Sequence, residues 1–118
     1  MKPLLLAFVL STATTLCMAK TPDCTSPDAW PAAMAFAHLK NADLISNEST
    51  DFTHVRVSRL ASEKTGKNLY HQIHRIRFPQ KIGEVVEVIT SHDASSEECS
   101  MSDVDVYLVS KHLGGKVR

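Results

Sequence analysis

Hydrophobic and polar residues alternate along much of the chain from residue 52 to residue 111, in short runs rich in β-branched residues. A two-residue period of this kind predicts strands with one buried face. The runs predict four strands, over Phe52 to Leu60, Leu69 to Phe78, Glu84 to Ser91 and Asp103 to Lys111. The residues between them predict a hairpin loop at Ser62 to Lys67, a turn at Pro79 to Gly83 and a polar loop at His92 to Met101.

The stretch from Asp28 to Lys40 has a helical period instead. Asp28 can serve as the N-cap, and Pro31 then falls in the first turn, where the helix ladder needs no backbone N–H. The apolar stripe expected on this helix consists of Ala29, Trp30, Ala33, Phe36 and Ala37. Alanines between two aromatic residues suit close packing against a sheet, so we expect the helix to lie on one.

One helix followed by four strands with short connections predicts antiparallel neighbours and a single α+β domain. We expect a helix packed on a four-stranded antiparallel sheet over residues 20–118. If Val104, Val106 and Leu108 pack under the helix, alternation places Tyr107 and Val109 on the uncovered face of the sheet. We expect His54 and Arg56 on that same face, as part of a surface for contact with a partner.

Residues 1–19 have the three zones of a secretory signal peptide: Lys2, an apolar run from Leu4 to Leu10, and small residues up to Ala19. The expected result is cleavage after Ala19 and a mature chain of residues 20–118 in the periplasm or outside the cell. The apolar run is shorter than the roughly 20 residues that a membrane-spanning helix needs, so we expect no stable membrane insertion.

The chain has three cysteines, and Cys17 lies inside the predicted leader. Cys24 and Cys99 remain as an even pair in an exported chain, which predicts a disulfide. Lipidation of Cys17 is an alternative, but the residue before it, Leu16, is not the small residue expected there. Two free thiols would require a reducing compartment and hence no leader.

This order of elements, with a disulfide from just before the helix to the approach of the last strand, resembles the layout of cystatin-like folds and of small periplasmic immunity proteins. The cystatin loop Gln-x-Val-x-Gly has no counterpart, because the second strand reads Tyr-His-Gln-Ile-His over residues 70–74. The resemblance therefore implies a layout and no functional residue.

Thirteen basic residues balance thirteen acidic ones, so a globally basic nucleic-acid binder is excluded. The charges are nevertheless segregated along the chain. From residue 54 to residue 81 there are seven Lys or Arg and one acid, and from residue 82 to residue 110 there are seven acids and no Lys or Arg.

Cross-strand pairing explains part of this segregation, because Arg75 and Arg77 precede a turn that Glu84 and Glu87 follow. Pairing does not explain the acids gathered around Cys99, which are Asp93, Glu97, Glu98 and Asp103. They form either a contact surface for a basic partner or a solvated loop.

Four histidines, His54, His71, His74 and His92, lie on or near neighbouring predicted strands. They suggest an alternative function, a small hydrolase or nuclease using His92, Asp93 and a strand histidine. His71 and His74 have opposite parity in a regular strand, so they cannot share one site without a bulge. No nucleophile-elbow or metal-site motif is present, and we assign no catalytic residue, cofactor or metal.

The leading hypothesis is an exported protein-binding domain, an inhibitor or immunity-type protein that blocks another protein by shape and charge. The partner is expected to be a protein with a basic surface, and no nucleic acid. The candidate contact residues are His54, Arg56, His92, Asp93, Glu97, Glu98, Asp103 and Tyr107. A carrier of small ligands is a further alternative, although the alanine-rich helix favours close packing over a pocket.

Overall fold

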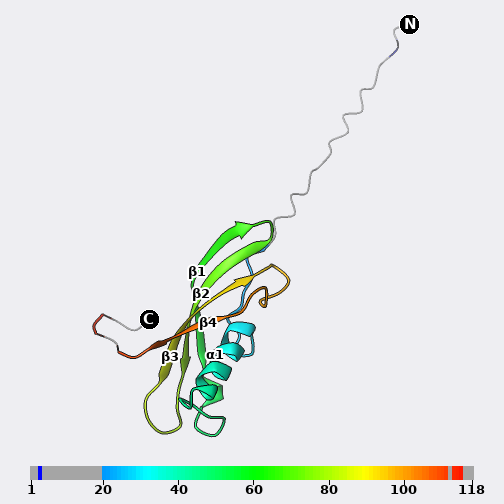
Figure 1. The fold of residues 1–118 in the computed structure, drawn as a ribbon. Helices are drawn as coiled ribbons and strands as arrows, with labels where there is room; N and C mark the ends of the chain where they lie inside the picture. Colours follow the sequence, from blue (N-terminus) through cyan, green and yellow to red (C-terminus); the bar gives the residue numbers. More distant parts are fainter. Residues whose placement is uncertain (1–2, 4–19, 112, 116–118) are drawn as a thin grey trace.

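The computed structural model describes residues 3, 20–111 and 113–115, so the expected leader at residues 1–19 lies outside the described residues except for Pro3. One helix is followed by four strands in a sheet of order β1-β2-β3-β4, and every neighbouring pair is antiparallel. The elements are α1 (Trp30–Asn41), a short 3₁₀ helix η1 (Phe52–His54), β1 (Arg56–Gly66), β2 (Leu69–Phe78), β3 (Val86–Ala94) and β4 (Asp105–Val109). The predicted α+β architecture is confirmed (Figure 1).

Helix α1 packs on one side of the sheet, against β2 and β3. We call this side the covered face and the other side the open face. Small Ala32 and Ala35 let the helix approach Ile76, Phe78 and Val88, all at most 2% exposed. Side chains along β2 alternate strictly between buried and half-buried, as expected for a strand with one covered face.

The helix differs from its prediction in two respects. Its N-cap is Ala29 rather than Asp28, and no side chain caps the first turn. Its buried stripe consists of Pro31, Ala32, Ala35 and Leu39. The predicted stripe was therefore wrong, because the helix is rotated about its own axis relative to the prediction. Alanines occupy both sides of this helix, and spacing alone does not tell which alanines face the sheet.

Strand β1 begins later and runs much further than predicted, through the segment expected to be a hairpin loop. The turn has only two residues, Lys67 and Asn68, and Asn68 adopts a positive φ of 52°. Asn tolerates that conformation better than most residues, which permits the tight turn. Register shifts at Arg59/Ala61 and Lys64/Gly66 interrupt the pairing of β1 with β2.

Strand β3 continues through Ala94, so His92 and Asp93 are strand residues and not part of a loop. They pair with Gln72 and His71, because β2 is long enough to offer backbone partners beyond the apolar run. Strand β4 is shorter than predicted at both ends.

The predicted disulfide is confirmed: Cys24 and Cys99 are bonded, with their Cα atoms 5.9 Å apart. It ties the segment before α1 to the connection between β3 and β4. The Trp30 indole N–H reinforces this link by donating to the Ser102 carbonyl at 3.0 Å. No helix in the described part of the chain has the length and apolar character to cross a bilayer.

Candidate functional site

The open face of the sheet carries most of the side chains that could contact a partner. Cross-strand register arranges them in rows that run from β4 to β1. The rows are Val109, Glu87, Arg77 and Arg56; Tyr107, Ile89, Arg75 and Ser58; Asp105, Ser91, Ile73 and Ala61; and, without a β4 member, Asp93, His71 and Glu63.

One end of the open face is basic. Arg75 and Arg77 both approach the Glu87 carboxylate, with Nε to Oε1 distances of 3.4 Å and 4.0 Å, and Arg56 lies opposite Arg77. The predicted cross-strand pairing is therefore confirmed for Glu87, whereas Glu84 lies exposed in the connection between β2 and β3. Three arginines against one carboxylate in this row and its neighbour leave this end with a local positive charge.

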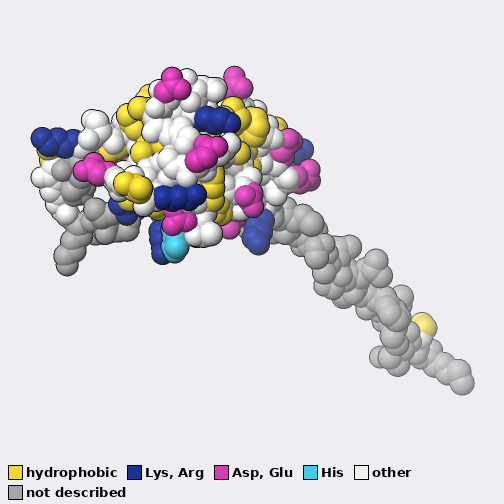
Figure 2. Space-filling model, turned by 90° about the horizontal axis from the view of Figure 1, so that it is seen from below, with side chains coloured by type: hydrophobic (Ala, Val, Ile, Leu, Met, Phe, Trp, Pro, Cys, Tyr) yellow, Lys and Arg dark blue, Asp and Glu magenta, His cyan; other side chains and the backbone are white. Residues whose placement is uncertain are grey.

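Figure 2 views the molecule from the end where the connection between β2 and β3 lies. It shows basic and acidic side chains interspersed with hydrophobic ones. A surface of this mixed kind has neither the uniform basic charge of a nucleic-acid site nor a broad apolar area.

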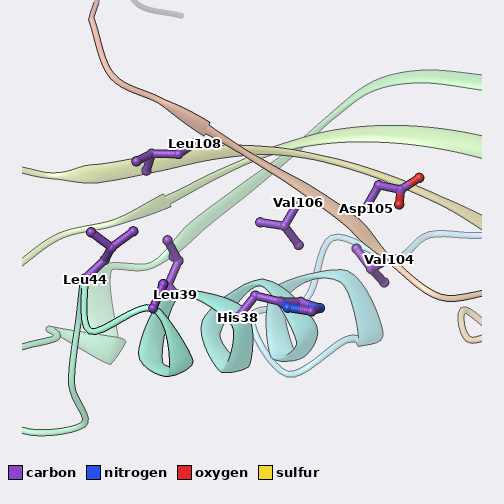
Figure 3. A pocket seen from close by; sticks show the side chains of 8 residues that line it. His38, Leu39, Leu44, Val104, Asp105, Val106 and Leu108 are labelled. Atoms are coloured by element: carbon purple, nitrogen blue, oxygen red, sulfur yellow. The ribbon is translucent and has the colours of Figure 1, made fainter.

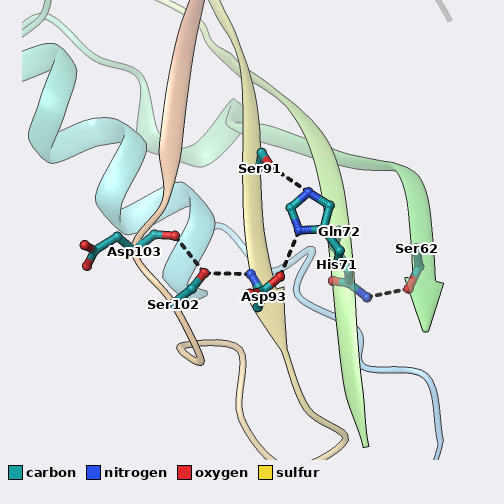
Figure 4. A network of polar contacts seen from close by, with 7 residues as sticks. All are labelled: Ser62, His71, Gln72, Ser91, Asp93, Ser102 and Asp103. Atoms are coloured by element: carbon teal, nitrogen blue, oxygen red, sulfur yellow. Dashed lines mark hydrogen bonds and ion pairs between the residues drawn. The ribbon is translucent and has the colours of Figure 1, made fainter. Parts of the chain in front are cut away.

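The other end of the open face holds a chain of hydrogen bonds through His71 (Figure 4). The Asp93 carboxylate lies 2.8 Å from His71 Nδ1, and Ser91 Oγ lies 2.9 Å from His71 Nε2. A deprotonated carboxylate only accepts, so Nδ1 carries the proton, and in the neutral form of the ring Nε2 can accept from the Ser91 hydroxyl. The three side chains form a serine, histidine and aspartate relay on two neighbouring strands.

The acidic loop next to this end is held in place by its own hydrogen bonds. The N–H groups of Glu97 and Glu98 donate to Ser95 Oγ, and the Ser96 N–H donates to Asn68 Oδ1 at 3.0 Å. Cys99 adds the disulfide. The carboxylates of Glu97 and Glu98 are exposed, so the loop presents negative charge on a restrained backbone.

The predicted contact residues do not form one patch. Asp93 and Tyr107 lie on the open face; Arg56 lies at its basic end, six positions along β2 from the Asp93 row, which corresponds to about 20 Å. His54 lies in η1 and is bonded to Asp51 at 2.7 Å. Glu97, Glu98 and Asp103 are exposed in the connection between β3 and β4.

His92 lies on the opposite side of the sheet from Asp93, because neighbours in a strand point to opposite faces. It is 1% exposed and belongs to a buried polar cluster that we define as Gln72, His74, Thr90 and His92. An oriented base built from His92 and Asp93 is therefore excluded, and His71 takes the place expected of His92.

Within the buried polar cluster, six side-chain atoms have no hydrogen-bond partner among the described residues: Gln72 Oε1, Thr90 Oγ1 and both ring nitrogens of His74 and His92. Only Gln72 Nε2 is bonded, to the Pro22 carbonyl and to Ser62 Oγ. Burial, then the neighbouring His92 and Arg59, lowers the pKa of His74 to about 4. Burial also lowers the pKa of His92.

Two shallow grooves flank α1, and the ligand-carrier alternative would use one of them. One of about 300 Å³ lies between α1 and β4, and one of about 270 Å³ lies between α1, Phe52 and Phe78. In the ranges that the structure describes, no three His, Cys, Asp or Glu side chains are grouped as ligands for a metal ion.

Ser91 is the candidate residue that the sequence did not single out, and His71 was named only as one of four histidines without a role. The predicted third strand ended at Ser91 and left Asp93 in a loop. The usable signal was parity, because Ser91 and Asp93 are two apart and so share a face once the strand is extended.

No family model, no curated protein and no solved structure matches this chain. The cystatin-like layout therefore stays a prediction.

Proposed function

We propose that this chain is an exported protein-binding domain, of the inhibitor or immunity type, that contacts its partner through the open face and the acidic loop. The observation that carries the proposal is the open face itself: α1 covers only the other side, and Tyr107 is 61% exposed between an acidic and a basic end. Tyr and Arg are the residue types enriched in protein contact patches.

The arrangement of charge supports a protein partner that carries an acidic patch opposite the basic end of the open face and a basic patch opposite the acidic end. Arg56 and Arg77 lie at one end of the strands, and Asp93 with Glu97 and Glu98 at the other, so a partner with an acidic and a basic patch would be oriented along the strands. Complementary charge of this kind accelerates encounter and sets orientation more than it adds affinity.

The rigidity of the surface supports a blocking role. The sheet and the disulfide-bonded loop are ordered before any partner arrives, so little conformational entropy is lost on binding. A preformed surface can then cover a functional region of the partner without rearranging.

The test is capture of a partner from envelope and culture fractions, with the intact chain as bait. Tyr107→Ala and the pair Glu97→Lys and Glu98→Lys should each reduce the captured amount about tenfold or more. Lys40→Glu, on the exposed side of α1, is a charge reversal outside the proposed contact surface and should leave capture unaltered. Absence of a stable partner, or equal capture by all variants, would contradict the proposal.

The Ser91 relay favours a second candidate, a small hydrolase acting by nucleophilic attack. In that mechanism His71 Nε2 takes the Ser91 proton as the oxygen attacks a carbonyl, while Asp93 holds the ring in the required tautomer. The relay replaces the predicted use of His92.

A fluorophosphonate probe distinguishes the two candidates, because it labels only an activated serine. A hydrolase should give a covalent adduct on Ser91 that His71→Gln and Ser91→Ala both abolish. Partner capture unaffected by His71→Gln, together with no adduct, would leave protein binding as the function and remove the enzyme.

A further inference from the structure

The two outer strands of the sheet differ in how they are protected from pairing with another chain. β1 carries two register shifts and four charged residues, Arg56, Arg59, Glu63 and Lys64. Bulges and edge charges are the usual means of blocking edge-to-edge pairing. β4 has an uninterrupted register with β3 over all five residues and one charged residue, Asp105.

β4 also has one strand neighbour, β3, in the described part of the chain. Its sequence Asp-Val-Tyr-Leu-Val is rich in residues that favour strands. Tyr107 is 61% exposed on the open face and Leu108 is 49% exposed on the covered face. The strand thus presents apolar surface on both sides of an unprotected edge.

A groove accompanies this edge on the covered side (Figure 3). It holds about 300 Å³ between the C-terminal half of α1 and β4, with Val106 and Leu108 on the strand side and the exposed Leu44 on the helix side. An additional strand beside β4 would place its own covered-face side chains next to this groove.

The charges along β4 favour a second copy of the same segment as the strand that pairs with this edge. Acidic Asp103 and Asp105 lie at its start, and basic Lys111 lies just past its end. An antiparallel copy of the same segment reverses this order, so each acidic end meets a basic end. With the two-fold axis at Tyr107, Val106 of one copy pairs with Leu108 of the other, and Asp103 comes opposite Lys111.

We propose that β4 pairs antiparallel with β4 of a second copy of this chain, joining the two sheets into one of eight strands. The pairing satisfies edge backbone groups and brings Val106 and Leu108 of both copies into one apolar strip along the groove. Tyr107 of both copies lies at the two-fold axis, so the two open faces become continuous.

The interface is small. Five strand residues span about 17 Å, so the area covered falls short of that of a standard stable complex and the dimer is a reversible one. Sedimentation of the intact chain from about 1 μM to 1 mM should therefore show a monomer–dimer equilibrium.

Two sets of variants test the register. Leu108→Lys should weaken self-association about tenfold or more, because it places a charge at the centre of the apolar strip. Asp103→Lys should weaken it as well, and Lys111→Asp added to Asp103→Lys should restore it, because the charges are exchanged. Glu48→Lys, an exposed acid in the connection between α1 and η1, is the control and should leave self-association unaltered.

Circular dichroism and the thermal midpoint show that each variant is folded before its association is compared. A chain that stays monomeric up to about 1 mM overturns the proposal. Dimers insensitive to Leu108→Lys, or no rescue by the exchanged charges, also overturn it, because the contact then lies elsewhere or involves another register.

Discussion

The imidazole rings of His74 and His92 lie side by side on the covered face, with their centroids 5.4 Å apart. Both side chains are at most 1% exposed, and none of their four ring nitrogens has a hydrogen-bond partner among the described residues. Burial is the main cause of the lowered pKa of both rings. His92 and Arg59 lower the pKa of His74 further and Asp23 opposes them, whereas for His92 the charge of Asp93 opposes the lowering and His71 adds to it. The pair is therefore kept neutral by burial.

Acid should destabilise the fold through this pair. The folded pKa of His74, about 4, lies below its ordinary value of 6.5, so between these pH values the unfolded chain binds a proton that the folded chain does not. The contribution of His74 to the unfolding free energy is thus fully present above pH 6.5. It falls by about 1.4 kcal/mol per pH unit below that value, and about 3 kcal/mol is lost by pH 4. Urea denaturation at a series of pH values measures this slope.

His74→Leu should flatten the slope between pH 6.5 and 4, whereas His38→Gln, an exposed change on α1, should leave it as it is. The lowered pKa of Asp23, caused mainly by its hydrogen bonds with Thr25, acts in a separate window because its effect is lost only below 3.8. Equal slopes for His74→Leu and the unaltered chain would contradict the assignment.

Removing the disulfide should reduce stability by about 4 kcal/mol, since it closes a loop spanning 75 positions of sequence. The double variant Cys24→Ala and Cys99→Ala measures this in urea without a reductant. Dithiothreitol should lower the urea midpoint of the unaltered chain to a similar extent and should not change the urea midpoint of the double variant. A midpoint indifferent to both treatments would show that the bond contributes little.

Two phenylalanines that contact the same ring should respond differently to truncation. Phe78 is 2% exposed and Phe52 is 49% exposed, and their ring centroids lie 6.1 Å and 5.0 Å from that of Phe36. Phe78→Ala should cost about 3–5 kcal/mol, because it leaves a cavity under α1. Phe52→Ala should cost less than about 1.5 kcal/mol, the scale of an aromatic pair. Similar losses in chemical denaturation would contradict this difference in burial.

Asn68 has two roles that substitutions can separate. Its positive φ permits the two-residue turn, and its Oδ1 accepts the Ser96 N–H of the acidic loop. Asn68→Gly should keep the turn but speed amide hydrogen exchange at Ser96, whereas Asn68→Asp should retain the acceptor and the protection. Exchange at Ser96 that is equal in all three chains would show that this hydrogen bond does not hold the loop.

Local pattern was enough to predict the class of fold. The alternation in β2 was read correctly at both ends, because its five covered-face residues are bounded by clear turn signals. The pairing of Cys24 with Cys99 followed from counting, since the third cysteine, Cys17, lies in the segment predicted to be a leader. Pro31 in the first turn placed the helix start within two residues.

The sequence alone determined one helix, four antiparallel strands and a disulfide, because period, turn residues and cysteine number are local properties. Tertiary structure decided which side of the alanine-rich helix is buried and how far β3 extends, because both depend on packing and on the backbone partners that β2 offers. The extension of β3 to Ala94 in turn placed Asp93 beside His71 and buried His92 beside His74. Because β3 extends three residues beyond the predicted end, His92 and Asp93 lie in a strand and point to opposite faces of the sheet. Only the pairing of β3 with β2 fixes that register.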